Sequence, residues 1–249
     1  MHAFKLNISI HKWLSLIVGL QLLIWLATGL YFNLMDHGKA TGNALRVHMQ
    51  HEGNLPNFEL LAVSELESAP PLELKLVWLF QRPYYHAIYE RGQHNYQLRQ
   101  SALFDATTGN QHALTDKQVL TLAQGSYSGS GKVGVPVLVE PPFSDYIAQQ
   151  NPMWKVDVDD EVNTTIYLDA VTGQILRHVN DDSRLKDLMM KLHFMDYGNT
   201  GGFNHWLIIA FAVATLMLSC TGIIWLVQQY KKGVLKINWR KKRKHNVVT

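Results

Sequence analysis

Two long, uncharged, apolar segments constrain this chain more than any other feature of its sequence. One runs from Trp13 to Phe32 and the other from Trp206 to Val227, and neither contains Asp, Glu, Lys or Arg. A helix rises about 1.5 Å per residue, so about twenty residues span the roughly 30 Å hydrocarbon core of a bilayer. The sequence therefore predicts two transmembrane helices. The first is longer than the apolar part of a secretory signal, and no A-x-A pattern follows it, which argues against a cleaved signal peptide.

The charges that flank these segments predict the orientation of the chain. Lys5 and Lys12 precede the first segment without an acidic residue, and only basic charges follow Gln229, whereas all 20 acidic residues lie between the two segments. The positive-inside rule then places both termini in the cytoplasm. We expect a multi-pass protein of the bacterial cell inner membrane, with its central part in the periplasm. We interpret the basic tail as a topology signal that touches anionic membrane lipid, and we expect no nucleic acid partner.

The region between the two segments has the pattern of an α+β domain. Residues 57–69 and 116–124 have helical character, and Thr115 is placed to cap the second of these helices. Residues 125–152 are rich in Gly, Ser and Pro and predict a long loop. Alternating apolar residues between turn signals predict strands over residues 72–80, 86–90, 96–105, 153–160, 164–171 and 174–179.

An internal repeat lies within this region. The pattern Asp-Ala-x-Thr-Gly occurs at residues 105–109 and again at 169–173. In each copy the Asp carboxylate can accept hydrogen bonds from backbone amides of a tight turn, and the Gly can adopt a positive φ. We therefore interpret both copies as hairpin turns in two similar units, rather than as metal sites.

The two apolar segments also resemble each other. A Trp-Leu pair precedes a Thr-Gly pair by fifteen residues in both, from Trp13 to Thr28 and from Trp206 to Thr221. Small residues at these positions allow helix backbones to approach closely. Two helices make a thin bundle, so we expect a homodimer that forms a four-helix bundle. Cys220 is the one cysteine of the chain and is interpreted as a small packing residue.

These patterns together resemble a known family. The segment HKWLSL, which begins at His11 and leads to Thr28-Gly29-Leu30, resembles the first helix of the PepSY-associated transmembrane (PepSY_TM) family. Leu192-His193, followed by a Gly-rich turn and a helix that ends at Thr221-Gly222, resembles the family's next helix. The Asp-Ala-x-Thr-Gly turns resemble the PepSY repeat of its extracytoplasmic part. In size and two-helix layout the chain is most similar to the VciB-type inner-membrane ferric iron reductases, and it differs from larger members of the family in having two spans and no flavin domain.

The resemblance implies a redox function. It implies haem b, one or two per dimer, and electron transfer to periplasmic Fe³⁺ that supplies Fe²⁺ to a separate ferrous iron transporter. The chain has no Gly-rich phosphate-binding loop, so the electron donor is expected to be a quinol or a cytoplasmic flavoprotein. The alternative interpretation is a non-haem PepSY membrane protein that modulates a protease, a sensor or an iron transporter.

Four histidines beside the predicted spans are the candidate ligands of the haem iron. Low-spin haem takes two axial imidazoles, and neither apolar segment contains a histidine. His11 lies on the cytoplasmic side and would pair with the same residue of a second chain across a two-fold axis. His193 matches the family's Leu-His position and follows an apolar stripe of helical spacing. His37 and His205 fit equally well as polar anchors at the membrane interface, so iron ligation is predicted for His11 and His193.

The stripe beside His193 consists of residues at helical intervals, namely Leu185, Leu188, Met189, Leu192 and Met195. The predicted organisation has six parts: a cytoplasmic N-terminus (1–12), transmembrane helix 1 (13–33), a periplasmic PepSY-like α+β domain (34–182), an interfacial helix and elbow (183–204), transmembrane helix 2 (205–229) and a basic cytoplasmic tail (230–249).

Overall fold

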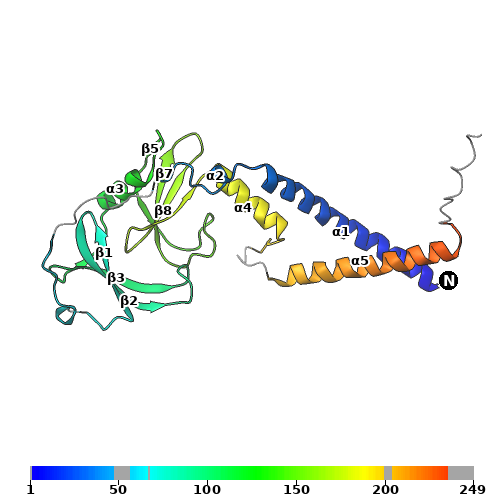
Figure 1. The fold of residues 1–249 in the computed structure, drawn as a ribbon, viewed down its shortest axis with the longest axis horizontal. Coiled ribbons are helices and arrows are strands. Elements are labelled where there is room, and N and C mark those ends of the chain that lie inside the picture. Colours follow the sequence, from blue (N-terminus) through cyan, green and yellow to red (C-terminus); the bar gives the residue numbers. More distant parts are fainter. Residues whose placement is uncertain (1, 48–56, 67, 199–203, 235–249) are drawn as a thin grey trace, which may run out of the picture. The chain divides into compact units, whose positions relative to one another are not determined.

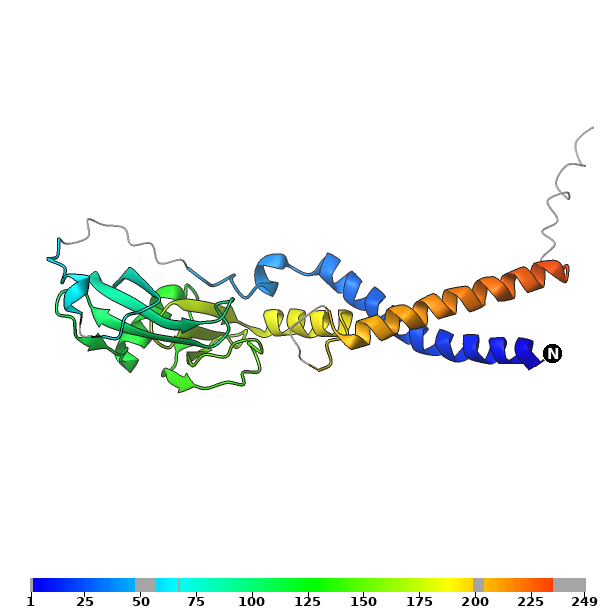
Figure 2. The ribbon, with the colours of Figure 1, turned by 90° about the horizontal axis from the view of Figure 1, so that it is seen from below.

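The computed structural model describes residues 2–47, 57–66, 68–198 and 204–234, with the backbone alone for residues 2–8. The chain divides into two compact units, which are described separately (Figures 1 and 2). The helical unit comprises residues 1–30, 192–196 and 202–249, and the β-rich unit comprises residues 31–191 and 197–201. The predicted basic tail lies outside the described residues from 235 onward.

Two long helices form the body of the helical unit. Helix α1 (His2–Leu34) contains the predicted span 13–33 and begins eleven residues before it, and helix α5 (Trp206–Lys231) contains almost all of the predicted span 205–229. Both are long and apolar enough to cross a membrane, over Ser9–Leu34 in α1 and over the whole length of α5. The helices are antiparallel, because His11, early in α1, contacts Thr221, late in α5, whereas Trp25, later in α1, contacts Phe211, early in α5.

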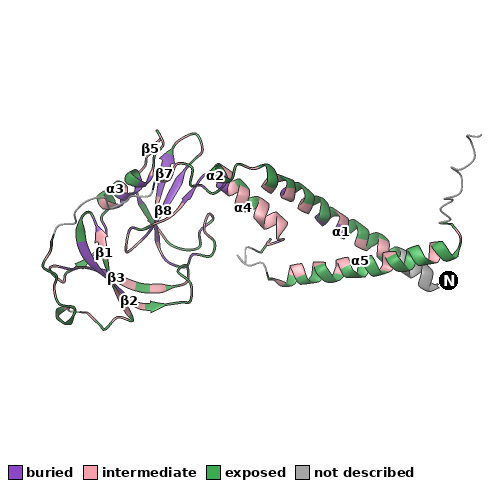
Figure 3. Cartoon of the chain, viewed as in Figure 1, coloured by how far each residue is buried: buried purple, intermediate pink, exposed green. Residues whose placement is uncertain are grey.

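Most large apolar side chains of these helices are exposed rather than packed against each other (Figure 3). On α1, Leu16, Leu23 and Leu26 are between 63% and 70% exposed. The buried side chains of α1 include two polar ones, Gln21 and Thr28. A helix with an apolar outer face and polar groups turned toward its neighbour has the arrangement expected of a membrane span.

The β-rich unit contains two antiparallel sheets. In the first sheet the strand order is β1-β2-β3-β4, and in the second it is β5-β7-β8-β9, with β6 paired to β7. The first sheet consists of β1 (Glu73–Leu79), β2 (Arg82–Arg91), β3 (Arg99–Asp105) and β4 (Gln111–His112). The second consists of β5 (Lys132–Val133), β6 (Val137–Val139), β7 (Met153–Asp159), β8 (Thr165–Asp169) and β9 (Ile175–Val179).

Helix α3 (Asp116–Ser126) packs on the strands and completes the main core. Thr115 caps it as predicted, and the side chain of Gln118 bonds back to the Thr115 amide in a capping box. Val119, Leu122 and Ala123 on one face of the helix belong to the same buried cluster as side chains from both sheets. The cluster contains Leu79, Tyr84, Leu103, Leu114, Val156, Val158, Ile166 and Leu168.

Two sequence predictions for this unit are wrong. The expected helix over residues 57–69 is absent from its described part, which holds only the 3₁₀ turn Val63–Glu65. The backbone of Leu61 bonds to distant residues instead of to its own segment. Its amide donates to the Ala106 carbonyl (2.8 Å), and its carbonyl accepts from the Tyr85 hydroxyl (2.9 Å). The expected loop over residues 125–152 contains strands β5 and β6, whose backbone pairs with β7.

The two Asp-Ala-x-Thr-Gly segments are hairpin turns, which confirms their interpretation. Asp105 Oδ1 accepts hydrogen bonds from the amides of Thr107 (2.9 Å) and Thr108 (3.2 Å), and the φ of Gly109 is 76°. Asp169 Oδ1 does the same for the next turn, with amide distances of 3.1 Å and 2.7 Å, and the φ of Gly173 is 67°. One turn joins β3 to β4 and the other joins β8 to β9.

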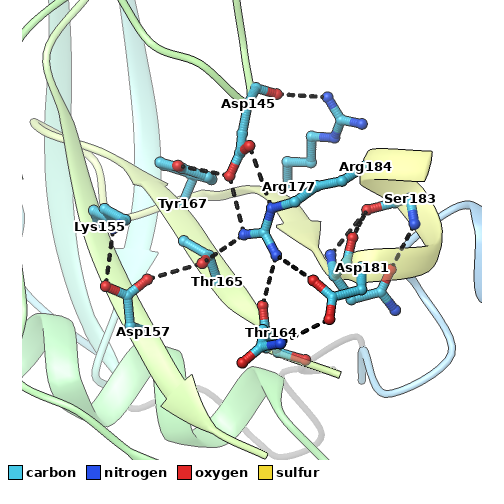
Figure 4. A network of polar contacts seen from close by, with 12 residues as sticks. Asp145, Lys155, Asp157, Thr164, Thr165, Tyr167, Arg177, Asp181, Ser183 and Arg184 are labelled. Carbon is cyan, nitrogen blue, oxygen red and sulfur yellow. Dashed lines mark hydrogen bonds and ion pairs between the residues drawn. The ribbon is translucent and has the colours of Figure 1, made fainter. Parts of the chain in front are cut away.

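Arg184 holds the beginning of helix α4 (Asp181–His193) on the strands and loops of the β-rich unit (Figure 4). The guanidinium of Arg184 donates from Nη2 to Asp145 Oδ2 (3.1 Å) and Thr165 Oγ1 (3.0 Å), and from Nη1 to the Asn163 carbonyl (2.8 Å). Charged, multiply bonded guanidinium contacts of this kind are among the stronger side-chain interactions in proteins. Arg184 therefore fixes the first turns of α4 on strand β8, on the turn before β8 and on the loop between β6 and β7.

The apolar stripe predicted over residues 185–195 lies on helix α4 except for its last residue. Leu185 and Leu188 lie on α4 and are 44% and 48% exposed. The helix ends at His193, and Met195 follows it with a φ of 54° and a buried side chain. Met195 is therefore not part of the stripe, because the chain has left the helical conformation before it.

A buried histidine of the β-rich unit makes the stability of the protein depend on pH. His178 is fully buried, and its Nε2 lies 3.0 Å from Ser126 Oγ. The Ser126 hydroxyl donates to the Ala123 carbonyl (2.9 Å), so it accepts the Nε2 proton of His178. Burial, and secondarily the positive charge of Arg46, lowers the pKa of His178 to about 4. The ring is therefore neutral in the folded protein above that pH.

We expect the free energy of unfolding to fall as the pH is lowered from about 6.5 to 4. In this range the unfolded chain protonates His178 and the folded chain does not, so each pH unit costs about 1.4 kcal/mol and the whole range costs about 3 kcal/mol. Denaturant unfolding of the detergent-solubilised protein and of H178Q, across this range, measures the slope. The slope for H178Q should be smaller than that for the wild type by about 1.4 kcal/mol per pH unit. Burial also lowers the pKa of His86, which contributes equally to the slopes of both proteins.

The exposed His94 supplies the control, because its ring reaches solvent in both states. H94Q should keep the wild-type slope. Equal slopes in wild type and H178Q would contradict the assignment to His178.

Candidate functional site

His11 lies beside a threonine of the other long helix. Its Nδ1 is 3.0 Å from Thr221 Oγ1, and the two residues are 210 positions apart in the chain. The next residue, Gly222, leaves room for the ring, since a Cβ there would lie 3.3 Å from His11 Cε1. The Thr221 hydroxyl also donates to carbonyls of its own helix, those of Met217 and Leu218, both at 2.9 Å.

His193 makes the same kind of contact with α1. Its Nδ1 is 2.8 Å from Thr28 Oγ1, and Thr28 is only 2% exposed. The Thr28 hydroxyl donates to the carbonyls of Ile24 (2.7 Å) and Trp25 (3.2 Å). The segment Leu192–His193 is held by its backbone as well, because Gln21 Nε2 donates to the Leu192 carbonyl (3.3 Å) and Trp25 Nε1 to the His193 carbonyl.

Aromatic side chains pack around His193. The ring of Trp25 is tilted against the His193 ring with 6.1 Å between centroids, and it also packs edge-to-face on Phe211 with 5.3 Å between centroids. Phe194 lies edge-to-face with His193 at 5.2 Å. The imidazole therefore lies in largely apolar surroundings, where a hydrogen-bond partner on the ring is worth more than at a wet surface.

The two histidine–threonine contacts use the Thr-Gly pairs that repeat in the sequence. The sequence predicts Thr28-Gly29 and Thr221-Gly222 to be points of close helix approach, and it does not predict their contacts with histidines. The equal fifteen-residue spacing was the only signal of a shared role. We call His11 with Thr221, and His193 with Thr28, the two His–Thr pairs.

The two His–Thr pairs lie far apart along the helices. Seventeen residues of α1 separate His11 from Thr28, which corresponds to about 25 Å of helix. The axial nitrogens of one haem iron lie within a few ångströms of each other, on opposite faces of the ring. His11 and His193 of one chain therefore cannot bind the same iron.

The other two candidate histidines have different surroundings. His205 precedes α5, and its Nε2 lies 3.0 Å from the Phe194 carbonyl, to which it must donate because a carbonyl only accepts. This bond ties the start of α5 to the end of the α4 segment. His37 is exposed and begins the short helix α2 (His37–Ala40) in the β-rich unit.

The described residues contain no group of three or more His, Cys, Asp or Glu side chains arranged to hold a metal ion. A site of this kind is not required for haem, since the porphyrin supplies four of the iron ligands and the protein supplies one or two. In both His–Thr pairs the threonine hydroxyl contacts Nδ1, so Nε2 would be the ring nitrogen that coordinates the haem iron. Metal-ligating histidines commonly hydrogen bond through their other ring nitrogen, and the two pairs fit this pattern.

The fold and the site define a membrane protein with two apolar helices and a β-rich domain between them in the sequence. A family model described as the PepSY-associated TM region matches residues 8–248, nearly the whole chain, and the chain belongs to this family. Searches of curated proteins and of solved structures gave no match. The closer resemblance to VciB-type reductases stays a prediction.

Proposed function

We propose that this protein is a haem b-containing ferric reductase of the bacterial inner membrane, which passes electrons to periplasmic Fe³⁺. The observation that carries the proposal is the presence of two His–Thr pairs in the apolar helical unit, each engaging the histidine through Nδ1. Haem bound at these histidines would supply one-electron transfer chemistry. The residues of this chain would hold, orient and surround it.

Each chain would contribute one imidazole at each of two levels. His11 and His193 are separated by about 25 Å of helix, so they would hold two different haems rather than one. A two-fold axis would bring the same residue of a second copy to each haem, and the two copies together would hold it. The proposed assembly is a homodimer with a four-helix bundle and two haems.

The electron balance requires an external donor. One Fe³⁺ takes one electron to become Fe²⁺, so a quinol or a reduced flavoprotein, which releases two electrons, would reduce two ferric ions. The two protons of a quinol leave with its oxidation and are not needed at the iron. Fe²⁺ would then pass to a separate transporter, because two helices per chain do not make a pore for it.

The proposed topology follows from charge. The acidic residues lie between the two apolar helices and the flanks are basic, which favours cytoplasmic termini and a periplasmic β-rich domain. Exposed apolar side chains such as Leu20 on α1 and Ile209 and Leu216 on α5 would face the lipid. This orientation would place the His11 pair toward the cytoplasm and the His193 pair toward the periplasm.

We expect the purified protein to contain one haem b per chain, or two per dimer. A Soret band, sharp α and β bands after dithionite reduction, and a pyridine haemochrome count measure it. H193A and H11A should each lose about half of the haem, because each removes both ligands of one level in a dimer. H37A, which changes an exposed histidine of the β-rich unit, should keep the wild-type content.

A folded but colourless wild-type protein would overturn the haem proposal. That result would favour the alternative, a non-haem membrane protein that modulates a protease, a sensor or an iron transporter. Full haem content in both H193A and H11A would overturn the assignment of the ligands.

We expect cells that express the wild-type protein to reduce external Fe³⁺ faster than cells that express H193A or H11A. Loss of either haem level interrupts the path between donor and iron, and the expected decrease is about tenfold or more. Trapping of Fe²⁺ with ferrozine in whole cells measures the rate, and immunoblotting normalises it to the amount of membrane-inserted protein. Equal rates in wild type and both variants would contradict a reductase function.

A further inference from the structure

We propose that helix α4 ends inside the apolar layer of the membrane, where Gln21, Trp25 and His205 replace water at its last carbonyl groups. The proposal goes beyond the proposed function, because it concerns the place of a chain segment in the membrane and holds with or without haem. It rests on contacts within the helical unit, to which residues 192–196 belong.

The carbonyl groups at the end of α4 accept hydrogen bonds from side chains of other segments. In chain order, the pairs are the Leu192 carbonyl with Gln21 Nε2 (3.3 Å), the His193 carbonyl with Trp25 Nε1, and the Phe194 carbonyl with His205 Nε2 (3.0 Å). We call the three donors the α4 cap. The last four carbonyls of a helix have no partner within the helix, and at a wet surface water satisfies them. Here three consecutive carbonyls have protein donors instead.

The level of the α4 cap along α1 lies well inside the apolar span. The span covers Ser9–Leu34, and Gln21 and Trp25 lie thirteen and nine residues before its end. At about 1.5 Å per residue, these positions are about 20 Å and 14 Å of helix from that end. Residues 13–35 contain no charged side chain. Because α1 crosses the membrane at this span, the end of α4 lies beside the interior of the apolar layer.

Helix α5 gives the same level. Trp25 packs edge-to-face on Phe211, five residues after α5 begins, with 5.3 Å between the ring centroids. The same indole donates to the His193 carbonyl, so the end of α4 lies level with the second turn of α5. Residues 206–230 contain no charged side chain. The end of α4 is therefore at a level where both long helices are apolar.

A helix end at this depth needs protein donors, because hydrocarbon offers no hydrogen bonds. Irregular backbone occurs inside membranes only where protein covers it or water lines it. Met195, where the chain has left the helical conformation, is 3% exposed. Gln21 is the one amide side chain among residues 13–32, and it is 8% exposed. The α4 cap thus explains why a glutamine stands in the middle of an apolar span, turned away from lipid.

Two charged residues, Lys191 and Asp196, flank the capped carbonyls. Both are only partly exposed. Helix side chains lean toward the N-terminus of their helix, so Lys191 leans away from the end of α4, and long lysine side chains extend from an apolar layer toward water. Charged side chains inside a membrane face protein rather than lipid, which agrees with the partial burial of both residues.

Spin-label accessibility in lipid nanodiscs measures the depth. In a C220A background, single labels are introduced by L192C at the end of α4, by L23C at the same level of α1, and by L138C on strand β6, where the native side chains of Leu23 and Leu138 are exposed. The ratio of collisions with oxygen to collisions with nickel ethylenediamine diacetate rises with depth. We expect the ratio for L192C to match that for L23C. A ratio nearer to that for L138C would overturn the proposal.

Amide hydrogen exchange in nanodiscs, without a label, supplies a second test. Q21L removes one donor, and W25F removes another while it keeps an aromatic ring. In hydrocarbon no water can replace a lost donor, so each variant should increase the exchange over residues 190–195 by about tenfold. Where water reaches the helix end, it would replace the donor. Wild-type exchange in both variants would therefore contradict a helix end inside the apolar layer.

Gln228 of α5 provides the matched control. It lies seven residues beyond Thr221, whose contact with His11 marks the opposite end of the helix pair from the α4 cap. Q228L also replaces an amide of a long helix by leucine, and it should leave the exchange over residues 190–195 at the wild-type rate. An increase in Q228L equal to that in Q21L would show a general effect of this replacement and would count against the proposal. A colourless wild type would defeat the proposed function and leave both measurements of depth standing.

Discussion

The packing of the helical unit depends on one requirement. An imidazole ring among apolar helices needs a hydrogen-bond partner. A polar ring in such surroundings is costly unless a neighbouring group satisfies it. In this protein the neighbour is a helix threonine, whose own proton is already given to a carbonyl of its helix. The same contacts hold α1 against α5 and Leu192–His193 against α1, so the hydrogen bonds of the two rings also contribute to the packing of the helical unit.

The elements that could be predicted from sequence have local signals. The two apolar helices follow from uninterrupted runs without charge, and helix α3 follows from Thr115 and Gln118, which form the predicted cap. The two hairpin turns follow from Asp and Gly at fixed positions, because an Asp carboxylate and a positive-φ Gly satisfy the turn without help from distant residues. The helix cap and the two turns are each decided within about five residues of chain, and each apolar helix within one continuous run.

The elements that could not be predicted are decided by distant residues. Residues 57–69 have a helical pattern, but the backbone of Leu61 bonds to Ala106 and Tyr85. Strands β5 and β6 are two and three residues long, and only their pairing with β7 distinguishes them from loop. The His–Thr pairs join positions 165 and 210 residues apart, so no local pattern contains them. Histidines near a span could be selected from sequence, but their ring partners could not.

The distance between the two His–Thr pairs would link the proposed haem to the proposed dimer. One chain offers one imidazole at each of two levels about 25 Å apart, so it cannot by itself provide two axial ligands to an iron from this set. Under the proposed function, a haem held by two copies of His11 or of His193 would therefore require a second chain. The haem content and the oligomeric state of the protein would then depend on each other. The antiparallel helices with a threonine at each end give both levels the same local chemistry, which a two-fold axis along the bundle would duplicate.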